Sequence, residues 1–153
     1  MSSPAEIKLE RRIRAVPAAV YAYLTSSAGW ARWQGQSASV EAVPGGLFRV
    51  TVGEGQIAEG RFVELIPNSR VVFTWGWRGH PLLPPESSTV EIDLLPDGDG
   101  TIVRLTHRGL PHEEIASHAL GWEHYVPRLV IAAEGGDPGR DAGPGGLRGR
   151  TSP

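Results

Sequence analysis

The sequence predicts an α+β domain in which a curved antiparallel sheet of about seven strands packs against one long C-terminal helix. A long run of strand-like segments ends at Arg108, and an amphipathic helix follows from about Pro111 to Ala133. Apolar residues recur along this helix at intervals of 4, 3, 4, 3 and 4 residues, which places them on one face. They are Ile115, Ala119, Trp122, Val126, Leu129 and Ala133. A single helix that follows so much sheet must lie on that sheet.

The N-terminal elements are predicted from alternation and from helix-start signals. Residues Glu6–Arg14 alternate between apolar and polar side chains, which predicts a strand with one face toward a core. Pro17 is tolerated in the first turn of a helix and opens a short one that ends near Leu24. A second short helix carries two tryptophans and is capped by a serine. These residues are Trp30 and Trp33, with Ser26 or Ser27 as the cap.

Six more strands are predicted between the short helices and the long one. Turn-forming sequences rich in Gly, Pro, Asn and Asp separate most of them, so neighbours form antiparallel hairpins. Only 78–86, with three prolines, is a longer loop. A bulge is expected at Gly60, because Glu59 and Arg61 otherwise share a face with apolar residues. The predicted strands are Gln36–Val43, Leu47–Val52, Gln56–Ile66, Arg70–Trp77, Ser88–Leu95 and Thr101–Arg108.

Alternation within the strands predicts which side chains face the helix. Three strands each present a clear apolar face. These faces are Val71, Phe73, Trp75 and Trp77; Val90, Ile92 and Leu94; and Val103, Leu105 and His107. His107 is therefore a polar group on an inward face.

Composition limits the class of protein. With 153 residues, 40% of them hydrophobic, and no run of 18 apolar residues, the sequence predicts one domain without a membrane span. No basic stretch followed by an apolar one is visible at the N-terminus, so we expect a cytoplasmic protein. A net charge of −2 does not favour nucleic-acid binding, and the absence of Cys excludes disulfides and thiolate chemistry.

The last twenty residues differ in composition from the rest. Residues 134–153 contain seven Gly and three Pro, and Leu147 is their only large apolar side chain. Such a segment buries too little apolar surface to offset the entropy of ordering. We therefore expect a folded domain over residues 1–133 and a disordered tail over 134–153.

Several motifs resemble known sites but lack a required part. Gly53–Ala58 imitates a dinucleotide-binding turn, but predicted strands flank it. Asp97–Arg108 begins like a calcium loop and ends on Arg instead of Glu. Three histidines on the long helix are six residues apart and point to different sides. They are His112, His118 and His124. We expect no metal and no cofactor.

The order of elements and a series of short motifs resemble a known superfamily. The chain is similar to the START-like (SRPBCC) superfamily with its helix-grip fold, and to the branch named after the activator of heat-shock protein 90 ATPase. The resemblance covers roughly residues 6–133 and depends on the order of the motifs rather than on one of them. They are Trp33, Gly45-Gly46-Leu47-Phe48, Gly60 ahead of Glu64-Leu65-Ile66-Pro67, Val72-Phe73-Thr74-Trp75, Ser88-Thr89-Val90, Gly100-Thr101 with Val103 and Leu105-Thr106-His107, and His118 with Gly121-Trp122 and Leu129.

This resemblance implies a domain that contains a ligand cavity. The chaperone activator that gives the branch its name has a further N-terminal domain, whereas this chain starts at the first strand. We therefore expect a chaperone partner to be less favoured than a small apolar or amphipathic molecule. The oligomeric state is left open between monomer and homodimer.

The predicted cavity lies between the sheet and the long helix and has a volume of about 300 to 1,000 Å³. Trp75 and Trp122 are expected to line it, with His107 or His118 as a polar anchor. The predicted ligand-binding residues are Phe48, Phe73, Trp75, Trp77, His107, His118 and Trp122. A purely structural interpretation stays open, in which the histidines bond to backbone or water and the tryptophans fill the core. Glu113 and Glu114 are interpreted as complements of the helix dipole.

Three functions remain open at this point. The first is a non-enzymatic module that binds an apolar or amphipathic small molecule, as a sensor or carrier. The second is an enzyme that acts on such a ligand by general acid–base catalysis through His107 or His118. The third is a co-chaperone-like interaction domain, which would use the outer face of the sheet and need no cavity.

Overall fold

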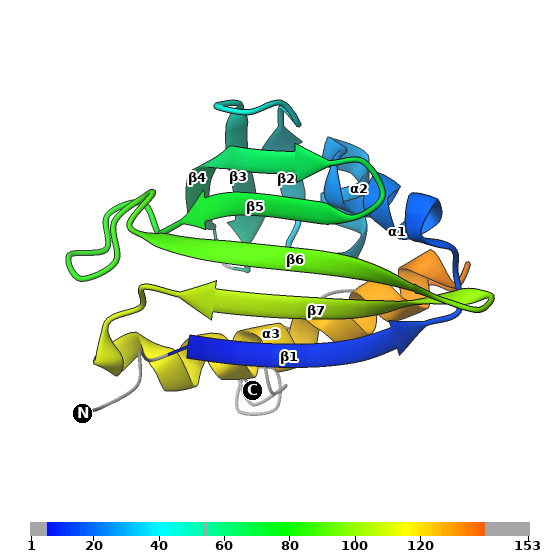
Figure 1. Ribbon diagram of the computed structural model, residues 1–153. Coiled ribbons are helices and arrows are strands. Elements are labelled where there is room, and N and C mark those ends of the chain that lie inside the picture. The colour runs from blue at the N-terminus through cyan, green and yellow to red at the C-terminus, as the bar shows by residue number, and fades with distance from the viewer. Residues whose placement is uncertain (1–5, 54, 140–153) are drawn as a thin grey trace.

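The computed structural model describes residues 6–53 and 55–139 and contains one antiparallel sheet with three helices (Figure 1). Its seven strands are ordered β1-β7-β6-β5-β4-β3-β2. The strands are β1 Glu6–Ile13, β2 Ser37–Val40, β3 Leu47–Val52, β4 Gln56–Ile66, β5 Arg70–Trp75, β6 Ser88–Asp97 and β7 Gly100–Arg108. The helices are α1 Pro17–Leu24, α2 Ser27–Trp33 and α3 His112–Ala133. The predicted α+β helix-grip fold is confirmed.

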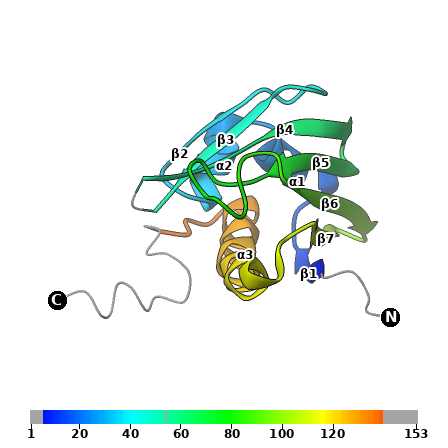
Figure 2. The same cartoon turned by 90° about the vertical axis from the view of Figure 1, so that its left-hand side faces the viewer.

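The sheet curves over α3, as Figure 2 shows in a view toward the N-terminal end of this helix. Helix α3 lies closest to β1, the strand at one edge of the sheet, and also contacts α1 and α2. Because α1 and α2 follow β1 directly, they cover the end of the sheet at which β1 finishes (Figure 1). The β5–β6 loop and the N-terminal half of α3 lie at the opposite end (Figure 2). In the described residues no helix is long and apolar enough to span a membrane.

The short helices begin where the sequence predicts. The side chain of Ser26 accepts a hydrogen bond from the backbone N–H of Gly29 at 3.0 Å and so caps α2. Ser27 has another role, because its hydroxyl accepts from the backbone N–H of Val40 at 3.0 Å. This bond ties α2 to β2 and fixes the tryptophans of α2 against the sheet.

Two strands are shorter than predicted. Strand β2 covers only residues 37–40, and β5 ends at Trp75 rather than Trp77. Gly76 ends β5 because the β5–β6 loop folds back onto it: a Cβ at this position would lie 1.7 Å from the carbonyl oxygen of Pro84. Trp77 then forms an isolated bridge to Ala58 of β4. Trp77 therefore lies outside β5, although its ring still contacts that of Trp75 at 5.3 Å between centroids.

The predicted bulge exists, but its position was wrong. Gly60 pairs regularly with Phe48, and the register shift between β4 and β5 lies between Phe62 and Glu64. Val63 is the extra residue and is 53% exposed. Glycine is required at position 60 for a different reason, since a Cβ there would lie 1.9 Å from the carbonyl oxygen of Thr74 on β5. The inward face of β4 is therefore formed by Ala58, Gly60 and Phe62.

An aromatic cluster fills the space beneath α2, which we name the packed region. Its rings lie in direct contact, with Phe48 and Phe73 stacked at 4.3 Å between centroids and Trp30 and Trp33 at 4.6 Å. Every member is at most 1% exposed. The members of the packed region are Trp30, Trp33, Phe48, Phe62 and Phe73. Two of them, Phe48 and Phe73, are among the predicted ligand-binding residues.

The described chain continues past α3 as far as Gly139, into the predicted tail. The guanidinium of Arg128, 9% exposed, donates to the carbonyl oxygens of Trp33, Pro138 and Gly139 at 3.0 Å each. The Glu134 carboxylate accepts from the backbone N–H of Arg14 at 2.8 Å. These bonds join residues 134–139 to the domain. The rest of the predicted tail, 140–153, lies outside the described residues.

Candidate functional site

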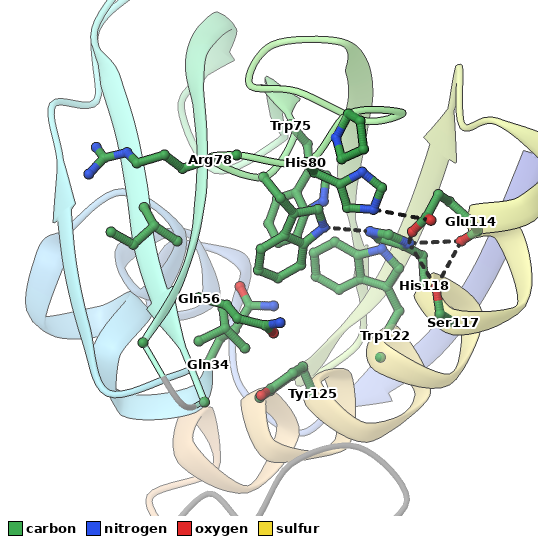
Figure 3. A pocket seen from close by; sticks show the side chains of 18 residues that line it. Gln34, Gln56, Trp75, Arg78, His80, Glu114, Ser117, His118, Trp122 and Tyr125 are labelled. Carbon is green, nitrogen blue, oxygen red and sulfur yellow. Dashed lines mark hydrogen bonds and ion pairs between the residues drawn. The ribbon is translucent and has the colours of Figure 1, made fainter.

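A cavity of about 680 Å³ opens between the β3–β4 hairpin, the β5–β6 loop and the N-terminal half of α3 (Figure 3). Its volume falls within the range of small-molecule sites. The indoles of Trp75, Trp77 and Trp122 form much of one wall. We name the cavity and these indoles the cavity region. The other polar or aromatic side chains in its lining are Gln34, Gln56, Arg78, His80, Glu114, Ser117, His118 and Tyr125.

The structure separates the predicted site residues into two groups. Trp75, Trp77, His118 and Trp122 line the cavity. Phe48 and Phe73 do not, because they belong to the packed region. His107 does not line it either and is fully buried behind the indole wall. The space between Trp75, His107 and Trp122 is filled by their own rings, since the Trp75 and Trp122 centroids lie 5.2 Å apart. The cavity lies on the other side of the two indoles.

His107 holds this wall in place through a hydrogen-bonded chain. Because an indole N–H is only a donor, Nδ1 of His107 accepts from Nε1 of Trp122 at 2.9 Å. The ring proton is then on Nε2 and is donated to the hydroxyl of Ser88 at 2.8 Å, which donates to the carbonyl oxygen of Trp75. Burial, together with the neighbouring His118, lowers the pKa of His107 to about 3. His107 is therefore a neutral structural imidazole.

His118 orients the second indole in the same way. Its Nε2 accepts from Nε1 of Trp77 at 2.9 Å, and its Nδ1 donates to the backbone carbonyl of Glu114 at 2.8 Å. Burial lowers the pKa of His118, although the Glu114 carbonyl and carboxylate oppose this effect. The predicted meeting of the two histidines occurs, since their ring centroids lie 5.5 Å apart. They meet inside the wall, not across an open space.

A contact between the β5–β6 loop and α3 borders the cavity (Figure 3). Nε2 of His80 lies 3.2 Å from a carboxylate oxygen of Glu114. Nδ1 of His80 accepts from the backbone N–H groups of Leu82 and Leu83, both at 3.1 Å. This arrangement leaves Nε2, the atom that faces Glu114, as the protonated ring nitrogen. The contact between His80 and Glu114 thus joins the loop to α3.

Two buried polar atoms in cavity-lining residues have no hydrogen-bond partner among the described residues. They are Oε1 of Gln34, a residue 3% exposed, and Nε1 of Trp75, a residue 2% exposed. A buried polar group without a partner costs about 1 to 3 kcal/mol. An acceptor and a donor are therefore unused beside the cavity.

Seven polar or aromatic lining residues were not predicted from the sequence: Gln34, Gln56, Arg78, His80, Glu114, Ser117 and Tyr125. One signal was available, because Glu114 and His118 are four residues apart and share a helix face. For Gln34, Gln56 and His80 the sequence holds no such signal, since turns and the Pro-rich loop bring them together. The described residues contain no group of three or more His, Cys, Asp or Glu that could hold a metal ion.

The fold and this site define a class of protein: a helix-grip domain with a cavity among its β3–β4 hairpin, its β5–β6 loop and its C-terminal helix. The model of the Activator of Hsp90 ATPase homolog 1-like protein family matches residues 14–134. The chain belongs to this family. No curated protein matches the chain.

Solved structures agree with this assignment. An AHSA1-like protein from Rhizobium etli is 44% identical, with a TM-score of 0.68, over 92% of this chain and 91% of its own. CalU16 from Micromonospora echinospora is 25% identical, with a TM-score of 0.70, over 85% and 76% of the two chains. The Aha1 dimer from Colwellia psychrerythraea shares the fold at 22% identity, with a TM-score of 0.75, over 86% and 97%.

Proposed function

We propose that the protein binds an apolar or amphipathic small molecule in the cavity region, as a carrier or sensor domain. The observation that carries this proposal is the cavity of about 680 Å³ with an indole wall. When a ligand displaces water from such an apolar surface, the free energy of the system decreases, which favours binding.

Catalysis by the histidines has less support. A general base needs a lone pair within reach of the substrate. The lone pair of His107 accepts from Trp122, and that of His118 accepts from Trp77. Both imidazoles are thereby committed to positioning the wall.

The family description raises activation of the Hsp90 ATPase as another function. That function would use an outer surface and leaves the cavity without a role. A pull-down with the purified chaperone tests it separately, since a cavity ligand need not affect that contact.

The proposal is tested with Nile red, a neutral aromatic dye that fluoresces in apolar surroundings. Gly121 lines the cavity, and a Cβ there would meet nothing within 4 Å. Gly121→Phe should therefore fill the cavity and abolish the saturable fluorescence increase that the unmodified protein gives. Ala116→Phe is the matched control, because Ala116 lies exposed on the same helix outside the lining. Equal dye binding by Gly121→Phe and the unmodified protein would contradict the proposal.

A further inference from the structure

We propose that the cavity selects amphipathic cations: molecules with a flat apolar body and a protonated amine, with Glu114 as the counter-charge. This inference rests on the proposed binding function and specifies the chemistry of its ligand. It follows from the charges in the cavity wall, the partners of those charges and the aromatic surface beside them.

Glu114 brings a formal negative charge to the wall, and its polar partners carry no formal charge. His80 is neutral, because its Nδ1 accepts two backbone N–H groups. His118 is neutral, because Nε2 accepts from Trp77 while Nδ1 donates to a carbonyl. The Glu114 side chain is 18% exposed, so solvent screens its charge less than on an open surface. The wall therefore has an acceptor whose charge is not paired.

The dipole of α3 offsets only part of this charge. Glu114 lies in the first turn of the helix, where the dipole acts as roughly half a positive elementary charge. The exposed Glu113 shares this turn and the same dipole. The helix end thus stabilises the carboxylates without cancelling the negative charge at the cavity.

Among the described lining residues, the one arginine is already paired with a carboxylate, which it shares with Arg49. Nε and Nη2 of Arg78 lie 3.2 and 3.0 Å from a carboxylate oxygen of Glu59. Its guanidinium points away from the centre of the cavity, whereas the carboxylate of Glu114 lies beside His80 and His118 (Figure 3). An anionic ligand would therefore be repelled by Glu114 and would find no unpaired cation in the described lining.

The aromatic surface favours the same ligand class. Indole faces carry negative electrostatic potential, so a cation over a tryptophan ring is stabilised. Trp77 and Trp122 line the cavity with His118, and His118 lies one helical turn from Glu114. A ligand can place its apolar body on the indoles and its ammonium group toward the carboxylate.

The test uses three ligands with one naphthyl body: 1-naphthalenemethylamine, 1-naphthalenemethanol and 1-naphthoate. Their affinities for the full chain are measured by isothermal titration calorimetry at neutral pH. Glu114→Gln removes the charge and keeps an acceptor for His80. Glu113→Gln is the matched control, because it removes a charge from the same helical turn outside the cavity lining. Circular dichroism is the control that both variants are folded.

We expect the amine to bind at least about tenfold more tightly than the carboxylate, with the alcohol between them. Glu114→Gln should reduce this ratio to about threefold or less and leave the alcohol unchanged, whereas Glu113→Gln should keep the original order. If the alcohol binds and the amine has no advantage, or if both variants behave alike, the inference is overturned while the binding function stands. If none of the three ligands binds, both fail.

Discussion

Two regions of the molecule are both rich in aromatic side chains, yet only one of them is filled. In the packed region the rings of Trp30, Phe48 and Phe73 rest on each other, under the cover of α2. In the cavity region Trp77 and Trp122 direct their N–H groups to imidazoles. Rings that pack against rings close the space between them. The rings of Trp77 and Trp122 line the cavity as well and keep a face for another molecule.

The cover over each region explains the rest of the difference. Helix α2 continues from α1 and is bound to β2 through Ser27 and to α3 through Arg128. The cavity region is covered by the β5–β6 loop, which reaches α3 through side chains of Trp77 and His80. Helix α2 brings two tryptophans into the core, whereas the β5–β6 loop inserts Leu83 and leaves a cavity beside it.

The largest expected contrast is the response to truncation of one ring in each region. Phe73→Ala should lower the free energy of unfolding by about 3 to 5 kcal/mol, because its neighbours enclose the new void. Trp77→Ala should cost less than about half as much, because Trp77 is only partly buried and borders an existing cavity. Urea denaturation measures both. Equal losses would mean that the two regions are packed alike.

A second expected difference is the response to acid, which acts through His107. Its pKa is about 3 in the folded protein and 6.5 as its ordinary value, so between these pH values only the unfolded chain binds the proton. The stabilisation that this group provides is complete above about pH 6.5 and decreases as the pH is lowered. The loss from pH 7 to pH 5 should be about 2 kcal/mol, and the lowered pKa of His118 adds to it in the same direction.

His107→Gln is the variant that isolates this effect. It removes the titrating group and keeps an amide that can accept from Trp122. Chemical denaturation at several pH values should give a flatter profile for this variant, although its stability at neutral pH is lower. An unchanged slope would show that other groups cause the acid response.

The segment after α3 should contribute to stability through its contacts with Arg128 and with the backbone of Arg14. Removal of 134–153 takes away two of the three acceptors of buried Arg128 and the partner of the Arg14 backbone N–H. This truncation should cost about 1 to 3 kcal/mol. Removal of 140–153 alone spares every one of these contacts and serves as the control. Identical melting temperatures for the two truncated proteins would show that residues 134–139 contribute nothing.

The smallest expected effect is a gain. Gly121→Ala should raise the free energy of unfolding by about 0.5 to 1 kcal/mol, because alanine favours the helix and its Cβ meets open space. Thermal denaturation of the two proteins is sufficient to measure it. A loss of stability would show that the cavity has no room beside Gly121.

Much of the fold could be predicted from the sequence because its signals are local. The bounds of β3 and β4 match those predicted, since Gly-rich and Pro-rich turns delimit both strands. The errors arise where distant segments approach each other. Gly60 and Gly76 are required by contacts with Thr74 and Pro84, and no local pattern distinguishes such a glycine from one in a bulge.

The candidate site could be predicted only in part. Alternation placed Trp75 and His107 on the inward face, and both are buried. It could not show that Trp122 donates to His107 and closes the space between sheet and helix. Glu114 was interpreted as a complement of the helix dipole, because a carboxylate in the first turn of a helix needs no ligand site to explain it. Its position beside His80 depends on the course of the β5–β6 loop, and a Pro-rich sequence does not specify that course.

The central claim is that ligands reach the cavity region and not the packed region, and the five tryptophans allow a direct test. In ¹⁵N-labelled protein each indole N–H gives its own NMR signal, which can be assigned by Trp→Phe variants and followed during titration with 1-naphthalenemethanol. The account predicts saturable shifts for Trp75, Trp77 and Trp122, and unchanged signals for Trp30 and Trp33. Shifts of all five signals together, or of none, would contradict it.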